Sequence, residues 1–89
     1  MTQPQNLLVE NCLKGDRKHQ KALYNYYSPK LFSRCLFYTQ NQTEAEEVFQ
    51  EAITGLFNNL HTFNGEEPLD DWIRRNFANL IINHFKSKR

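Results

Sequence analysis

Two groups of polar side chains recur at helical spacing, and each could contact a partner molecule. The first group is acidic and falls within two turns of one predicted helix, where residues three and four positions apart share a face. It consists of Glu44, Glu47, Gln50 and Glu51. Carboxylates on such a face favour a partner lined with arginine, because the guanidinium fork forms paired, charge-assisted hydrogen bonds. A solvated helix face is the alternative interpretation.

The second group lies near the end of the chain and combines amides with cations. Arg75, Asn79, Asn83 and Lys86 follow one another at steps of four, four and three, so they share one helix face. An asparagine amide carries a donor and an acceptor and can therefore read base edges. The cations expected to neutralise phosphates are Arg74, Arg75, Lys86, Lys88 and Arg89. Arg74 could instead pair with Asp70, and the whole face could be a solvated helix end.

No combination of residues indicates catalysis or a metal site. The three histidines are dispersed, no nucleophile stands beside a base, and no glycine-rich phosphate loop occurs. Cys12 and Cys35 lie in apolar stretches without a CxxC pair, so we expect two small buried hydrophobic residues rather than ligands or a disulfide. We therefore expect a non-enzymatic protein with no catalytic residue, metal or cofactor.

Charged residues are segregated along the chain, although the net charge is only +1. Residues 40–71 contain eight carboxylates and no Lys or Arg, whereas residues 72–89 contain five Lys and Arg and no carboxylate. This segregation favours two kinds of partner, a basic one for the middle and a polyanion for the end. Pairing of the acidic segment with its basic neighbours inside the molecule is the alternative.

The chain lacks an apolar stretch long enough to span a membrane, and residues 1–10 lack the basic start and apolar run of a secretory signal. We therefore expect a cytoplasmic protein. A chain of 89 residues suffices for one domain, which we expect to be a monomer in isolation.

Apolar periodicity is helical throughout and strand signals are missing, which predicts an all-α fold, a compact bundle of four to five helices in one domain over residues 1–89. The N-terminal helices are expected within residues 5–40, as 5–14, 17–27 and a continuation at Ser28-Pro29 that is either a new helix or a kinked extension. Thr43-Glu44-Ala45-Glu46 has the spacing of a capping box and opens a predicted helix over 43–60. A loop over 61–68 precedes the last helix, 69–87.

The apolar stripes of these helices predict the core. The residues expected to face inward are Leu8, Val9, Cys12, Leu13, Leu23, Tyr26, Tyr27, Leu31, Phe32, Cys35, Leu36, Ala45, Val48, Phe49, Ala52, Leu56, Leu60, Leu69, Trp72, Ile73, Phe77, Leu80, Ile81 and Phe85. Asn76 interrupts the last stripe and needs a hydrogen-bond partner there. Gly55 indicates either close packing of another backbone or a tolerated glycine.

Several short motifs resemble region 2 of the extracytoplasmic-function group of bacterial RNA polymerase sigma factors. They begin with Leu13-Lys14-Gly15-Asp16, Ala22-Leu23-Tyr24 and Ser28-Pro29-Lys30-Leu31-Phe32. Glu44-Ala45-Glu46-Glu47 and Gln50-Glu51 resemble the acidic helix of that family, written DAxDLxQExF. The promoter-reading segment is represented by Phe63-Asn64-Gly65-Glu66, Trp72-Ile73-Arg74-Arg75, Asn79 and the basic end. Each motif is weak alone, but their order and spacing cover about residues 7–89.

The resemblance implies a transcription initiation factor domain with two partners. The helix over 43–60 is implied to dock on the clamp helices of the beta-prime subunit of core RNA polymerase. The 61–68 loop and the last helix are implied to melt the promoter −10 element and hold bases of the non-template strand. Phe63 and Asn64 are candidates for holding a base, although Phe63 could equally close the core. An anti-sigma factor is a possible further partner in this family.

This sequence also departs from the family pattern. Asn64 replaces a common arginine, and the loop and the following turn are unusually acidic, which puts in doubt which base is read there. The family's helix-turn-helix domain, which reads the −35 element, has no counterpart in these 89 residues, so we expect a fragment of a longer factor. A degenerate factor is the alternative. The alternative function is a small helical protein–protein adaptor that does not bind DNA.

Overall fold

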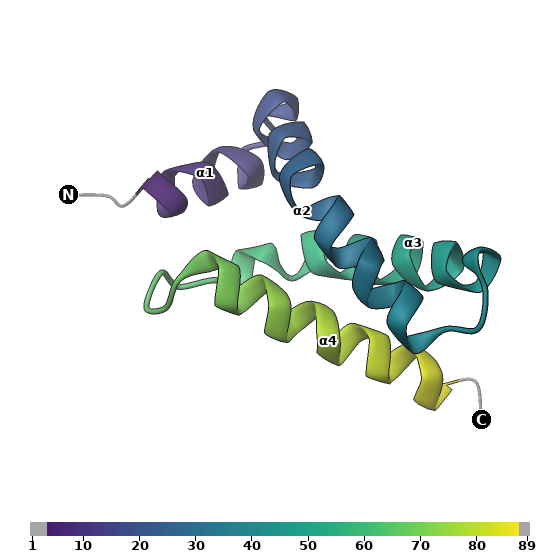
Figure 1. Cartoon of the computed structure of the whole chain (residues 1–89). Coiled ribbons are helices and arrows are strands. Elements are labelled where there is room, and N and C mark those ends of the chain that lie inside the picture. The colour runs from purple at the N-terminus through teal and green to yellow at the C-terminus, as the bar shows by residue number, and fades with distance from the viewer. Residues whose placement is uncertain (1–3, 88–89) are drawn as a thin grey trace.

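The computed structural model describes residues 4–87, and all regular structure in that range is helical (Figure 1). The chain folds into α1 (Pro4–Leu13), α2 (Arg17–Tyr38), α3 (Gln42–Asn58), the short 3-10 helix η1 (Leu60–Thr62) and α4 (Leu69–Ser87). In Figure 1, α3 and α4 run side by side in opposite directions and α2 crosses them. The predicted all-α fold is confirmed. Among the described residues, no helix has the length and apolar character needed to cross a bilayer.

The segment around Ser28-Pro29 is one uninterrupted helix rather than a new start. Residues 17–38 form a single α-helix with Pro29 inside it. Pro29 lies on the exposed side of α2, where water can satisfy the carbonyl that loses its intrahelical bond. Ser33 also donates a hydrogen bond from Oγ to the Pro29 carbonyl, at 3.0 Å. At the start of α2, Asp16 caps the helix as expected, accepting from the backbone N–H groups of Lys18 and His19.

The start of α3 differs from the predicted capping box. Asn41 is the N-cap, and its Oδ1 accepts a hydrogen bond from the Glu44 N–H at 2.8 Å. Asparagine is among the best N-cap residues, and the extended backbone of Asn41 suits this role. The predicted N-cap, Thr43, is therefore wrong by two residues, and the helix begins at Gln42, one residue before the predicted start. α3 also ends earlier than the predicted residue 60, at Asn58, because the chain then forms the tighter 3-10 helix η1.

The core lies between α2, α3 and α4, and η1 closes one end of it. Its fully buried side chains include Leu31, Val48, Leu60, Ile73 and Phe77. Most of the predicted stripes are buried, but three residues are corrected: Leu13, Tyr26 and Leu36 are exposed, Tyr26 by 62%. Neighbouring residues on a helix point about 100° apart, so an apolar run such as Tyr26-Tyr27 cannot be buried throughout. Ile53 and His84, which the stripes did not include, are buried.

Gly55 on α3 lies against the Leu80 side chain of α4. A Cβ placed on Gly55 would lie 2.9 Å from Leu80 Cδ2. The glycine therefore makes room for a side chain of α4 rather than for its backbone. On the same helix, Asn76 finds the partner it needs, since its Nδ2 donates to the Trp72 carbonyl at 3.0 Å.

Candidate protein and nucleic-acid interfaces

The acidic side of α3 faces solvent. Glu47, Gln50 and Glu51 are exposed and Glu44 is half-buried, while Val48, Phe49 and Ala52 point to the core from the opposite side. We call Glu44, Glu47, Gln50 and Glu51 the α3 flank. The structure therefore brings all four predicted residues onto one accessible face of a single helix.

Glu51 of the α3 flank contacts a side chain of α4. Glu51 Oε2 lies 2.5 Å from Nδ1 of His84. An ionised carboxylate has no proton to give, so the histidine nitrogen is the donor. His84 is only 5% exposed, whereas the Glu51 side chain is 61% exposed. The sequence analysis missed His84, although its position one turn after Leu80 and Ile81 in an apolar stripe was a usable signal.

A shallow groove borders the N-terminal end of the α3 flank. It is lined by Asn41, Thr43, Glu44, Glu47 and Phe85. The groove thus sets two carboxylates beside an aromatic side chain from α4. A partner arginine can use both features, because its guanidinium pairs with carboxylates and its plane stacks on aromatic rings.

The polar side of α4 is also accessible. Arg75, Asn79, Asn83 and Lys86 are exposed, and we call them the α4 flank. Ile82 lies among them and is half-exposed. No hydrogen bond within residues 7–87 engages the side-chain amide of Asn79 or Asn83. Two further predicted cations, Lys88 and Arg89, lie outside the described residues.

The acidic loop before α4 partly neutralises the two arginines of that helix. Arg75 Nη1 lies 2.8 Å from Glu67 Oε1, which holds this residue of the α4 flank against the loop. Arg74 Nη2 lies 3.5 Å from Asp71 and 4.0 Å from Asp70, so the predicted pairing of Arg74 with Asp70 is present but shared. Both arginines are exposed, and ion pairs at exposed sites are typically weak. The alternative of intramolecular charge pairing therefore holds for the loop and the start of α4.

The two loop candidates occupy different environments. Phe63 is half-buried, and its ring lies 5.5 Å from the ring of buried Trp72 in an edge-to-face arrangement. This placement favours the interpretation that Phe63 closes the core. Asn64 is exposed, and its Oδ1 accepts a hydrogen bond from the Glu66 N–H at 3.0 Å. Gly65 completes the turn with a positive φ of 79°, which a glycine adopts without strain.

A partly buried hydrogen bond ties α2 to the start of α4. The Tyr27 hydroxyl donates to Asp70 Oδ1. Burial, together with the adjacent Asp70 carboxylate, raises the pKa of Tyr27 well above its usual range, because the phenolate would be both desolvated and repelled. Tyr27 therefore stays a donor at any physiological pH and fixes Asp70 in place.

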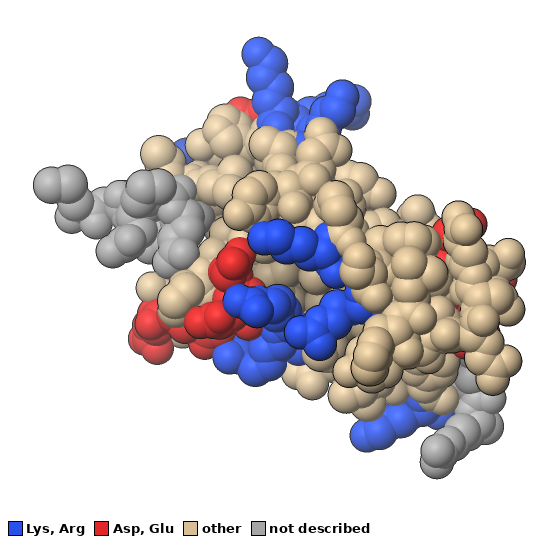
Figure 2. Space-filling view, viewed as in Figure 1, with Lys and Arg blue, Asp and Glu red and all other residues tan. Residues whose placement is uncertain are grey.

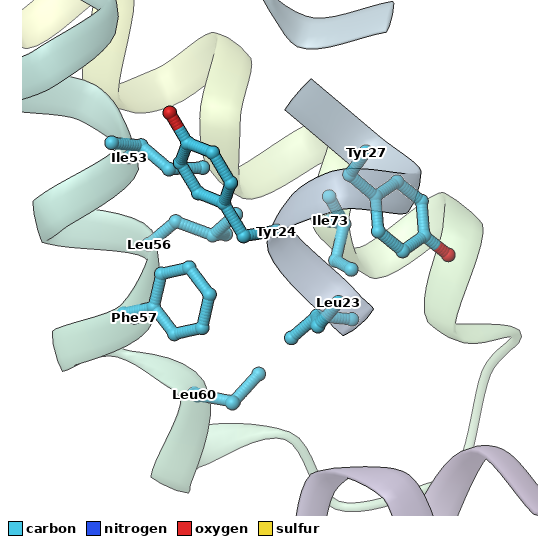
Figure 3. A pocket seen from close by; sticks show the side chains of 8 residues that line it. All are labelled: Leu23, Tyr24, Tyr27, Ile53, Leu56, Phe57, Leu60 and Ile73. Carbon is cyan, nitrogen blue, oxygen red and sulfur yellow. The ribbon is translucent and has the colours of Figure 1, made fainter. Parts of the chain in front are cut away.

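An apolar hollow among α2, α3, η1 and α4 has no room for a small-molecule ligand. Figure 3 shows its lining of Leu23, Tyr24, Tyr27, Ile53, Leu56, Phe57, Leu60 and Ile73. The hollow holds about 10 Å³, roughly one water position. The hydroxyls of Tyr24 and Tyr27 point away from it (Figure 3). It is a packing defect of the core rather than a binding pocket.

Neither the cysteines nor the other potential ligand side chains form a metal site among the described residues. Cys12 and Cys35 are both free and buried, as expected for small hydrophobic residues. Burial raises the pKa of the Cys35 thiol to about 11. Within residues 7–87, no three His, Cys, Asp or Glu side chains gather as a metal site would require.

Comparison with known proteins identifies the family. The model of Sigma-70 region 2 matches residues 23–89. The chain is 26% identical over 81 residues to the ECF RNA polymerase sigma factor SigW of Bacillus subtilis (strain 168), covering 91% of this chain and 43% of that protein. It is 28% identical over 89 residues to the RNA polymerase sigma-H factor of Pseudomonas aeruginosa, covering 99% of this chain and 46% of that protein. The chain thus spans less than half the length of these curated relatives, and it belongs to the Sigma-70 region 2 family.

Proposed function

We propose that this domain acts in transcription initiation by binding core RNA polymerase through the α3 flank and promoter DNA through the α4 flank. Membership of the Sigma-70 region 2 family supports a sigma factor domain. The observation that carries the two-partner proposal is the exposure of both flanks, one acidic and one basic with amides, on separate helices. Opposite charges suit a cationic protein surface and a polyanion respectively.

The polymerase partner is the pair of clamp helices of the beta-prime subunit. Glu47 and Glu44 stand at the rim of the groove that contains Phe85, so an arginine on the partner would meet charge and an aromatic face together. Gln50 adds an amide that can donate and accept. Anti-sigma proteins would find the same accessible surface, and we include such a protein as a possible competitor for it.

The DNA partner is the non-template strand of the −10 element. Asn79 and Asn83 carry amides that are uncommitted within the described residues, which leaves them available to base edges. Arg75 and Lys86 on the same face supply charge for phosphates. Taking a base out of the stack costs a few kcal/mol of free energy. Binding of the released bases can repay that cost, so the domain acts without catalysing a reaction. Asn64 and Gly65 in the exposed turn complete the candidate surface.

The proposal is tested by retention of core polymerase on the immobilised 89-residue chain, wild type against Glu47→Lys. We expect the reversal to weaken retention by at least about 10-fold, because a carboxylate in a charge-assisted pair becomes a like charge. Glu10→Lys is the matched control, since it makes the same change at an exposed site on α1. Circular dichroism should show the same helix content in all three proteins.

Two outcomes would contradict the proposal. Equal retention of the wild type and Glu47→Lys would remove the α3 flank as the docking surface. Absence of any binding to single-stranded −10 DNA at low salt would favour the alternative, a helical adaptor that binds proteins only. If the domain does bind DNA through phosphates, the affinity falls steeply as the salt concentration is raised.

A further inference from the structure

The α2 helix carries cations that neither flank uses. Its 22 residues contain five Lys and Arg and no Asp or Glu. Lys30 and Arg34 lie in its second half and are exposed. Within the part of the chain that the structure describes, neither forms an ion pair with a carboxylate, and Lys30 instead lies 4.8 Å from the centre of the Tyr26 ring. Intramolecular pairing therefore does not account for this part of the charge pattern.

These two cations border a notch between α2 and α4. The notch has a volume of about 340 Å³ and is lined by Tyr27, Lys30, Leu31, Arg34, Asp70 and Arg74. Three cations from two helices thus line the notch with one carboxylate, Asp70, which already accepts the Tyr27 hydroxyl. Arg74 also lies 3.5 Å from Asp71, outside the lining, so Lys30 and Arg34 supply the unpaired charge. Figure 2 shows Lys and Arg side chains gathered on this face, with acidic side chains beside them at one edge. An excess of positive charge around a hollow suits an anionic group.

The lining of the notch overlaps with that of a much smaller hollow further along the junction of α2 and α4. This second hollow, of about 10 Å³, shares Leu31, Arg34 and Arg74 with the notch and is also lined by Tyr38 and Ala78. Tyr38 is half-exposed at this end of α2. We call Lys30, Arg34, Arg74 and Tyr38 the α2–α4 seam. Cations spaced along a groove with an accessible aromatic ring are the features by which proteins hold single-stranded nucleic acid.

The α2–α4 seam adjoins the α4 flank. Arg74 and Arg75 are consecutive and therefore point about 100° apart around α4, one toward the seam and the other toward Asn79. Ala78 lies on the seam side of the helix and has the smallest side chain there. A strand held by the α4 flank could therefore cross α4 at Ala78 without meeting a bulky side chain.

We propose that the α2–α4 seam is a second binding site for single-stranded nucleic acid, which takes backbone phosphate between Lys30, Arg34 and Arg74 and stacks a base on Tyr38. The proposal rests on the proposed function, since it extends the path of a strand held by the α4 flank. It differs from that function in one respect: phosphate contacts carry no sequence information, so the seam binds any single strand. The ligand class is thus a single-stranded polyanion rather than a particular promoter base.

The test measures the affinity of the 89-residue chain for a fluorescent ten-nucleotide oligo-dT across a range of salt concentrations. In the double variant Lys30→Gln/Arg34→Gln we expect about 10-fold weaker binding at 0.1 M salt. We also expect the slope of log affinity against log salt to fall by roughly 1.4, because each single-strand phosphate contact contributes roughly 0.7. The matched control is Lys18→Gln/Lys21→Gln, which removes the same charge from exposed positions in the first half of α2. It should keep the slope.

Tyr38→Ala separates stacking from charge at the same site. We expect about fivefold weaker binding with an unchanged salt slope, because stacking releases no counterions. Equal effects of the two double variants would overturn the proposal, since the loss would then follow net charge alone. Weaker retention of core polymerase by Lys30→Gln/Arg34→Gln, with unchanged oligo-dT binding, would also overturn it and make the seam a protein contact. Either result leaves the α3 and α4 flanks standing, whereas no oligo-dT or −10 DNA binding by the wild type would sink both proposals.

Discussion

Glu51 of the α3 flank and Arg75 of the α4 flank each contact another side chain of the molecule, but the two contacts differ in burial. On α3, Glu51 contacts His84, which is almost fully buried. On α4, Arg75 contacts Glu67, and both of these side chains are reached by solvent, at 57% and 32% exposed. The first contact therefore satisfies a buried polar group of the core, whereas the second joins an exposed guanidinium to a partly exposed carboxylate.

This difference separates a structural contact from an exchangeable one. A buried donor left without a partner costs roughly 1–3 kcal/mol. An exposed ion pair contributes roughly 0.2–1 kcal/mol and is screened by salt. A partner that competes for Arg75 therefore displaces Glu67 at little cost. A partner that binds Glu51 must either leave the contact between Glu51 and His84 in place or lose the free energy that an unsatisfied buried histidine costs.

The comparison is tested most strongly by Glu51→Lys. We expect the free energy of unfolding to fall by about 2 kcal/mol, because the variant removes the acceptor of buried His84 and places a cation beside it. The measurement is urea denaturation followed by circular dichroism at 222 nm. Glu47→Lys is the matched control, with the same reversal one turn earlier on an exposed site that is not in contact with His84.

Equal stability losses in Glu51→Lys and Glu47→Lys would break the comparison, because the effect would then come from helix charge alone. This result also decides how docking variants are chosen. A loss of polymerase binding in Glu51→Lys mixes docking with stability, whereas the stability of Glu47→Lys, measured alongside, shows how much of its own loss comes from docking.

A third contact lies between the two extremes and should show an intermediate effect. Tyr27 is buried but its acceptor, Asp70, is close to half-exposed. We expect Tyr27→Phe to lower the free energy of unfolding by about 1 kcal/mol, the typical contribution of one hydrogen bond. Tyr26→Phe is the control, since its ring is exposed and it should change stability by much less. A loss from Tyr27→Phe as large as that of Glu51→Lys would show that burial of the donor alone sets the cost.

The sequence predicted the helices and which of their polar faces are exposed. Apolar periodicity placed the α4 core at Leu69, Trp72, Ile73, Phe77 and Ile81, and all five are buried. The same periodicity could not decide between Tyr26 and Tyr27, because adjacent apolar residues both fit a stripe and only tertiary packing selects one. Proline propensity likewise could not decide whether Ser28-Pro29 starts a new helix or continues the previous one. A proline inside a helix leaves one backbone carbonyl without its intrahelical hydrogen bond, and whether water can reach that carbonyl depends on how α2 packs.

The sequence could not predict which side chains of different helices would contact each other. The pairing of Glu51 with His84 joins residues 33 positions apart, and that of Tyr27 with Asp70 joins residues 43 positions apart. Helical spacing reports only neighbours within a turn, as for Arg74 with Asp70. The α2–α4 seam was missed on the same ground, because Lys30 and Arg34 meet Arg74 only after α2 has packed across α4.

The exchangeable contact on α4 gives the smallest predicted effect. In Glu67→Gln we expect about threefold tighter binding to single-stranded −10 DNA, because Arg75 is released from its ion pair and a charge that repels phosphate is removed. The free energy of unfolding should change by less than about 0.5 kcal/mol. The matched control is Glu66→Gln, which removes the same charge from the neighbouring exposed residue without any contact to Arg75. If the two variants tightened binding equally, general repulsion by the acidic loop would explain the gain, and Glu67 would not be holding Arg75 back from DNA.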